Sequence, residues 1–119
     1  MKKITTLLLA LLISGCASTH LAAPQNYRTK GDDNAVQITG KIDKKELLLS
    51  DEFIVSVFFN GFEQIKFKLD DSATGDGIGL PYQGKQTSSS CSSKRINEHT
   101  LDVRCIVFID NERTVTLTF

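Results

Sequence analysis

From Ala35 onward, hydrophobic and polar residues alternate with a period of two, which is the pattern of a β-strand with one buried face. The longest such run places one set of residues on a common face: Leu101, Val103, Cys105, Val107 and Ile109. No helical period of useful length follows the first 15 residues. About seven short strands at regular spacing favour an antiparallel sandwich or a small barrel. We predict an all-β sandwich over residues 35–119, immunoglobulin-like in general character.

Asn60-Gly61 lies between two apolar runs, a combination typical of a tight hairpin. A two-residue loop at Asn60-Gly61 would place apolar side chains opposite polar ones along the whole hairpin. A three-residue loop, Phe59-Asn60-Gly61, gives one uniformly apolar face instead, with Val55 opposite Ile65. Because register and burial agree in this second arrangement, we predict the three-residue loop.

This register makes Phe58 and Phe62 direct neighbours on the mainly polar face of the hairpin, beside Lys66 and Lys68. Either another element covers the two rings, or they form a contact surface. Exposed aromatic side chains gathered into one patch often mark an interface. Phe58 and Phe62 are therefore candidates for contact with a protein partner.

The remaining segments carry weaker patterns. Gly40 interrupts an apolar face, which predicts a β-bulge. Lys44-Lys45 is interpreted as a turn, and Leu47 to Leu49 as a short buried strand. Residues 110–112 are predicted to form a three-residue loop that closes the last hairpin.

The first 15 residues have the organisation of a secretory signal peptide. Met1-Lys2-Lys3 is positively charged, Ile4 to Ile13 is mainly apolar, and the small residues Ser14 and Gly15 follow. A membrane-spanning helix needs about 20 apolar residues, which is more than this run provides.

Ile13-Ser14-Gly15-Cys16 resembles the lipobox of bacterial lipoproteins. The resemblance implies that residues 1–15 are removed and that Cys16 is acylated with a diacylglycerol and a fatty acid such as palmitate. Several acyl chains together anchor a protein stably to a membrane. Ala17, where an Asp would favour the inner membrane, implies the outer membrane, on its periplasmic face. An ordinary secretory cleavage site beside an accidental cysteine is the alternative.

The chain from Cys16 onward begins with a segment, residues 16–34, that is rich in small, polar and breaker residues. It predicts a lipidated N-terminus and a flexible tether, in which His20 is solvated. Removal of residues 1–15 leaves 12 Lys and Arg against 14 Asp and Glu, a net charge of −2. This balance does not suggest a nucleic acid as partner.

Cys91 and Cys105 form an even pair once Cys16 is acylated, in an oxidising compartment. A short loop over residues 97–99 would place them opposite each other on adjacent strands, and Lys94 opposite Asp102. Zinc would need more ligands than two Cys and one His, and redox pairs are usually Cys-x-x-Cys. A structural disulfide is therefore favoured.

The predicted domain offers little catalytic chemistry. Its single histidine is His99, and its serines have no glycine elbow around them. Asp70, Asp71 and Asp76 fall in a predicted loop over residues 70–79, but their spacing does not match the EF-hand pattern of a Ca²⁺ site. We therefore expect no enzyme activity, no metal and no cofactor.

Two functions remain open at this point. The first is a lipid-anchored envelope protein that acts as a binding or structural accessory in the periplasm, docked onto a protein partner. The second is an inhibitor or immunity factor for a periplasmic target such as lysozyme. The second rests only on a similarity of format to small disulfide-bonded β lipoproteins.

Replacement of Cys16 tests the lipobox. Cys16→Ser is expected to abolish acylation and to leave an unprocessed or soluble protein, because the thiol is the group that receives the lipid. Palmitate labelling and membrane fractionation measure this. Continued labelling together with continued fractionation with outer-membrane lipid would contradict the interpretation.

Overall fold

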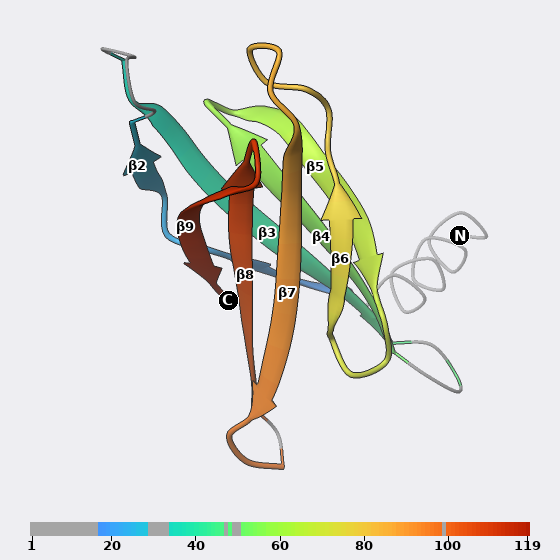
Figure 1. The fold of residues 1–119 in the computed structure, drawn as a ribbon. Helices are drawn as coiled ribbons and strands as arrows, with labels where there is room; N and C mark the ends of the chain where they lie inside the picture. The colour runs from blue at the N-terminus through green and yellow to red at the C-terminus, as the bar shows by residue number, and fades with distance from the viewer. Residues whose placement is uncertain (1–16, 29–33, 47, 49–50, 99) are drawn as a thin grey trace, which may run out of the picture.

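The computed structural model describes residues 17–28, 34–46, 48, 51–98 and 100–119 (Figure 1). Two antiparallel sheets pack on one another, which confirms the predicted β-sandwich. None of the described segments is a helix of the length and apolar character required to cross a membrane. The predicted signal peptide, residues 1–15, and Cys16 lie outside the described residues.

The first sheet has the order β1-β3-β4-β5, and β2 also pairs with β3. Its strands are β1 (Ala17–Leu21), β2 (Gln25–Tyr27), β3 (Val36–Glu46), β4 (Asp51–Phe59) and β5 (Phe62–Leu69). The second sheet has the order β6-β7-β8-β9. Its strands are β6 (Gly75–Ile78), β7 (Thr87–Arg95), β8 (Leu101–Ile109) and β9 (Glu112–Thr118).

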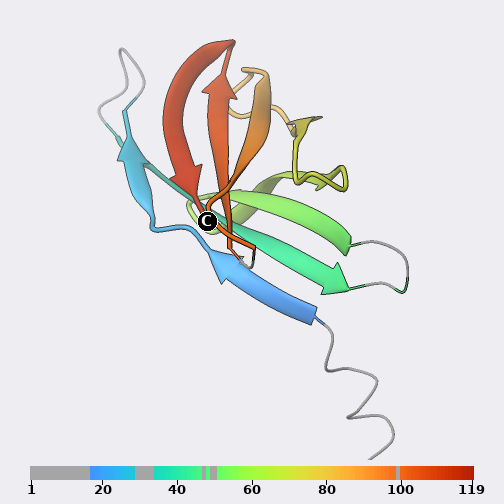
Figure 2. The same ribbon diagram turned by 90° about the horizontal axis from the view of Figure 1, so that it is seen from below.

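Strands that are neighbours in the sequence are mostly neighbours in a sheet, so each half of the sandwich is largely a meander. An immunoglobulin domain shares the two antiparallel sheets but connects them by Greek-key crossings. Seen from below, the strands of the second sheet cross those of the first at a wide angle (Figure 2).

Strands β1 and β2 occupy part of the segment that was expected to be a flexible tether. That expectation is wrong for the described residues. β1 pairs with β3 along its whole length, from Ala17 opposite Lys45 to Leu21 opposite Lys41. Among the described residues before β3, only Ala22 is classed as buried, so the alternating hydrophobic signal of a strand is missing here.

The β4–β5 hairpin closes with the two-residue loop Asn60-Gly61, and the predicted three-residue loop is wrong. Both loop residues have positive φ, 51° and 82°, as a tight hairpin turn of the primed type requires. Beyond the turn the register shifts at a bulge: Val57 lies opposite Ile65, and Gln64 is the extra residue. The bulge returns Val57 and Ile65 to the same buried face, so the apolar face expected from the sequence does form.

The β8–β9 hairpin repeats this construction. Its loop is Asp110-Asn111, again with positive φ at both residues, 54° and 64°, and the predicted loop over residues 110–112 is also wrong. The register then shifts between Ile106 and Phe108. In both hairpins the first loop residue donates its N–H to a glutamine carbonyl: Asn60 to Gln37 in β3 (2.8 Å), and Asp110 to Gln86, just before β7 (2.7 Å). The two sheets therefore share one local design.

The hydrophobic core fills the space between the inner faces of the two sheets. Gly40 lies on the inner face of β3, where the register with β4 is continuous, so the predicted bulge at Gly40 is wrong. A Cβ atom at Gly40 would lie 2.9 Å from Leu117 Cδ1 and 3.2 Å from Phe119 Cζ. The glycine is required because these two side chains of the last strand region pack directly against the β3 backbone.

Three further expectations need correction. Lys44 and Lys45 belong to β3, which continues to Glu46, so the predicted turn is wrong. Leu48 is fully exposed and lies in the β3–β4 turn, not in a buried strand, and its neighbours Leu47 and Leu49 lie outside the described residues. Part of the loop predicted over residues 70–79 is the edge strand β6.

Gly40→Val is expected to lower the free energy of unfolding by about 1–3 kcal/mol, because the added side chain overpacks the contact with Leu117 and Phe119. Gln37→Val, on the exposed face of the same strand, is the matched control and should leave stability nearly unchanged. Urea unfolding of the two variants decides the question. Equal stability would show that β9 does not pack on Gly40.

Candidate functional site

Phe58 and Phe62, the pair predicted to contact a partner, are not brought together by the structure. Phe62 lies opposite Phe59, and Phe58 lies opposite Glu63. Directly opposed residues share a face of an antiparallel pair, so Phe58 and Phe62 point to opposite faces of the hairpin. Phe58 is half-buried, whereas Phe62 is 62% exposed.

A second exposed apolar residue, Leu80, lies beside the same strand as Phe62, and the sequence did not indicate this. Leu80, 55% exposed, lies beside β5 because its N–H donates to the carbonyl of Gln64 (2.9 Å). Gln64 is two residues along β5 from Phe62. We name Phe62 and Leu80 the distal corner; Phe62 directly follows the β4–β5 turn, and Leu80 lies in the chain between β6 and β7.

Buried polar side chains fix the backbone of Leu80. Its carbonyl oxygen accepts hydrogen bonds from Gln64 Nε2 (2.5 Å) and Thr87 Oγ1 (2.8 Å). Gln64 Nε2 also donates to the carbonyl of Pro81 (3.2 Å). Gln64 comes from the first sheet and Thr87 from the second, and both are almost fully buried. The pair of hydrogen bonds therefore joins the two sheets at this carbonyl.

Gly79 lets the chain pass between the sheets just before Leu80. A Cβ atom there would lie 2.4 Å from Ile65 Cγ1 and 2.6 Å from the carbonyl oxygen of Gln64. Only a residue without a side chain fits so close to a neighbouring strand. Gly79 therefore allows the hydrogen bonds that hold Leu80.

Phe62 is held by the tight turn that precedes it. Asn60 donates its N–H to Gln37, and Asn60 Oδ1 accepts the N–H of Gln37 (2.9 Å), so the turn is tied to β3 twice. Behind it, Phe59 packs edge-to-face on Tyr82, with ring centroids 5.1 Å apart. The distal corner thus presents two apolar side chains on a backbone that hydrogen bonds to β3, β5 and Thr87 hold in place.

A hollow of about 730 Å³ lies at the opposite end of the sandwich, between the two sheets. Part of its lining is apolar: Ile42, Phe53, Leu101, Val103 and Phe119. Its charged lining residues have both signs, and Lys44 Nζ lies 3.7 Å from Asp51 and 3.9 Å from Glu46. His20, which was expected to be solvated, is exposed and lines this hollow. The described residues hold no group of three or more side chains placed to bind a metal, and His99 is outside them.

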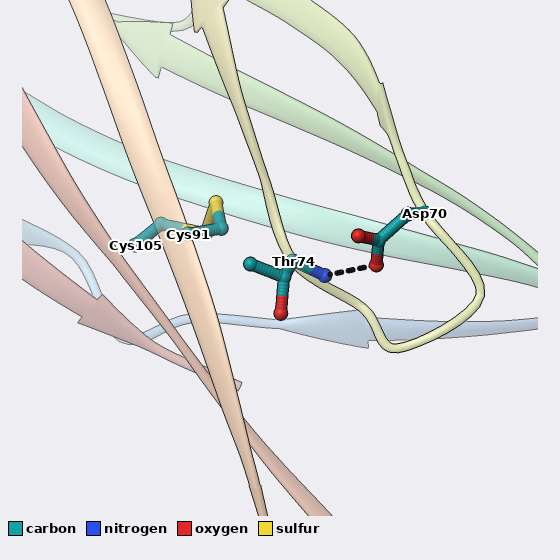
Figure 3. Close-up of a disulfide and its surroundings, with 4 residues drawn as sticks. All are labelled: Asp70, Thr74, Cys91 and Cys105. Carbon is teal, nitrogen blue, oxygen red and sulfur yellow. Dashed lines mark hydrogen bonds between the residues drawn. A yellow bond between two sulfur atoms is a disulfide. The ribbon is translucent and has the colours of Figure 1, made fainter.

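The cysteine pairing agrees with the sequence. Cys91 lies opposite Cys105 on adjacent strands, with the sulfur atoms 2.03 Å apart (Figure 3). The predicted neighbour pair, Lys94 opposite Asp102, is also present. Both cysteines are buried, which is typical of a structural bridge rather than a reactive pair.

Asp70, close to the disulfide in Figure 3, serves the turn between β5 and β6. Its Oδ1 accepts the backbone N–H of Ser72 (2.9 Å) and of Thr74 (3.0 Å). This is the hydrogen bonding of an aspartate in a turn, as the sequence favoured.

No family model, curated protein or solved structure matches the chain. The distal corner and the hollow are therefore assessed from their own geometry. The corner is the better defined of the two, because its side chains are apolar and exposed and hydrogen bonds fix the backbone that carries them. The hollow is open and ringed by charges of both signs.

Gln64→Ala tests whether the corner is held as described. Loss of the buried amide removes its hydrogen bonds to the carbonyls of Leu80 and Pro81, so the free energy of unfolding should fall by about 1–3 kcal/mol. Hydrogen exchange should also increase at the Leu80 amide. Glu63→Ala, at the exposed neighbouring position, is the control and should change stability by less than about 0.5 kcal/mol. Unchanged exchange at Leu80 in Gln64→Ala would refute the clamp.

Proposed function

We propose that the protein is a lipid-anchored component of the bacterial envelope that acts as a binding or structural accessory in the periplasm. In this proposal acyl chains on Cys16 hold it in the outer membrane, and the distal corner contacts a protein partner. The observation that carries the proposal is the position of β1. Its first residue, Ala17, directly follows Cys16 and lies at the end of the sandwich opposite the distal corner.

The length of β3 sets the separation between the two ends. β3 has 11 residues and runs from the region of the β4–β5 turn to the residues that pair with the start of β1. At about 3.3 Å per residue, such a strand is roughly 30 Å long. An anchor at Cys16 would therefore present Phe62 and Leu80 well above the membrane surface, where a periplasmic protein can reach them.

The chemistry of the corner supports binding rather than catalysis. Apolar and aromatic side chains on a fixed backbone lose no backbone entropy when a partner covers them. Phe62 also offers a large ring with few rotatable bonds. A protein partner suits these side chains better than a nucleic acid, which is bound mainly through basic residues.

Crosslinking in the native envelope tests this function. Phe62→Ser together with Leu80→Ser should remove the crosslinked partner, because the contact loses both of its apolar anchors. Ile78→Ser, at another exposed apolar residue (72%), is the control and should retain the partner. Melting temperatures of both variants should remain close to that of the parent protein.

The identity of the captured protein then separates the two functions considered from the sequence. An envelope structural protein supports the accessory function, whereas a lytic enzyme supports inhibition. If the double variant keeps its partner and Ile78→Ser loses it, the contact lies on the second sheet and the distal corner is not the site.

A further inference from the structure

The end of the sandwich opposite the distal corner exposes apolar side chains on two separate turns. Leu48, in the β3–β4 turn, is fully exposed, and Ile96, in the β7–β8 turn, is 62% exposed. Glu46, beside the first turn, and Glu98, within the second, line the same hollow, so the two turns border one end of the molecule. We name Leu48, Ile96 and the start of β1 the proximal end.

The start of β1 fixes how far this end can lie from an acylated Cys16. Ala17 is paired with Lys45 in the first sheet, so no free spacer separates the sheet from Cys16. Neighbouring Cα atoms are about 3.8 Å apart. The headgroup layer on each side of a bilayer is roughly 5–7 Å thick, from the difference between its total and hydrocarbon thickness. A sheet that begins one residue after the acylated cysteine must therefore start within the headgroup layer.

We propose that the proximal end rests on the phospholipid leaflet, with Leu48 and Ile96 inserted among the headgroups. This inference depends on the acylation of Cys16 in the proposed function. Leu48 is only three residues from Lys45, the strand partner of Ala17, and is therefore close to the anchor. Ile96 belongs to the other sheet. The acyl anchor, Leu48 and Ile96 are three points that are not on one strand, and three such points fix the orientation of the sandwich on the membrane.

The charges at the proximal end indicate which kind of lipid surface it fits. Lys44 and Arg95 lie there together with Glu46, Asp51 and Glu98. Charges of both signs do not produce the attraction to anionic lipid that clusters of basic residues produce. The contact is therefore an apolar one, suited to zwitterionic headgroups, and it should depend little on salt.

The absence of tryptophan from the sequence makes a direct test possible. Leu48→Trp, Ile96→Trp and Phe62→Trp each introduce a single fluorophore at an exposed position, the last as a control at the distal corner. The acylated full-length mature protein is placed on phosphatidylcholine vesicles whose acyl chains carry bromine, a contact quencher. Leu48→Trp and Ile96→Trp should show a blue shift and quenching severalfold stronger than Phe62→Trp. The effect should persist at high salt.

The outcomes separate the inference from the function on which it depends. If the protein does not float with the vesicles, the acyl anchor of the proposed function fails. If it floats but neither Leu48→Trp nor Ile96→Trp is quenched more than Phe62→Trp, the anchor stands and the membrane contact is wrong. Quenching at only one of the two turns would also overturn the proposed orientation, as would a loss of quenching at high salt.

Discussion

One extra residue in the second strand of the β4–β5 hairpin, and another in that of the β8–β9 hairpin, set which faces of the sheets are apolar. A two-residue turn of the primed type twists correctly for a hairpin, but in this sequence it places apolar residues opposite polar ones. The bulge at Gln64 shifts the register by one residue, and this shift brings Val57 and Ile65 onto the same buried face. Without it, half of the hairpin would present the wrong face to the second sheet.

Gln64 has a second effect because a bulged residue is not bound by the regular alternation of the strand. Its side chain turns to the edge of the sheet and donates to the carbonyls of Leu80 and Pro81. The residue that corrects the register of the first sheet therefore also joins that sheet to the second. Thr114, at the corresponding place in the β8–β9 hairpin, stays local and donates to Val107 O (2.7 Å).

The sequence predicted those parts of the fold in which burial alternates along a strand, such as β8 with Val103 and Val107, and it predicted the pairing of Cys91 with Cys105. It did not reveal β1, β2 and β6, because edge strands bury few side chains and so lack the alternating pattern. The bulges were also missed. A two-residue loop followed by a bulge and a three-residue loop without one produce the same apolar face, so the hydrophobic pattern does not distinguish them. Of the distal corner, the sequence identified only Phe62. Leu80 is held beside β5 by a backbone hydrogen bond, and the pattern of hydrophobic residues does not reveal such bonds.

The pairing of β1 with β3 also has a mechanical consequence. If the chain is held at its N-terminus by lipid and pulled by a partner at the far end, the load runs nearly parallel to β1. The inter-strand hydrogen bonds from Ala17 to Leu21 would then be loaded together in shear, because the two strands are antiparallel and the anchor is attached where β1 begins. A ladder loaded in shear must break its bonds simultaneously, whereas one pulled from the side opens bond by bond. Under such a load, β1 would therefore resist tension better than a strand that is pulled from the side.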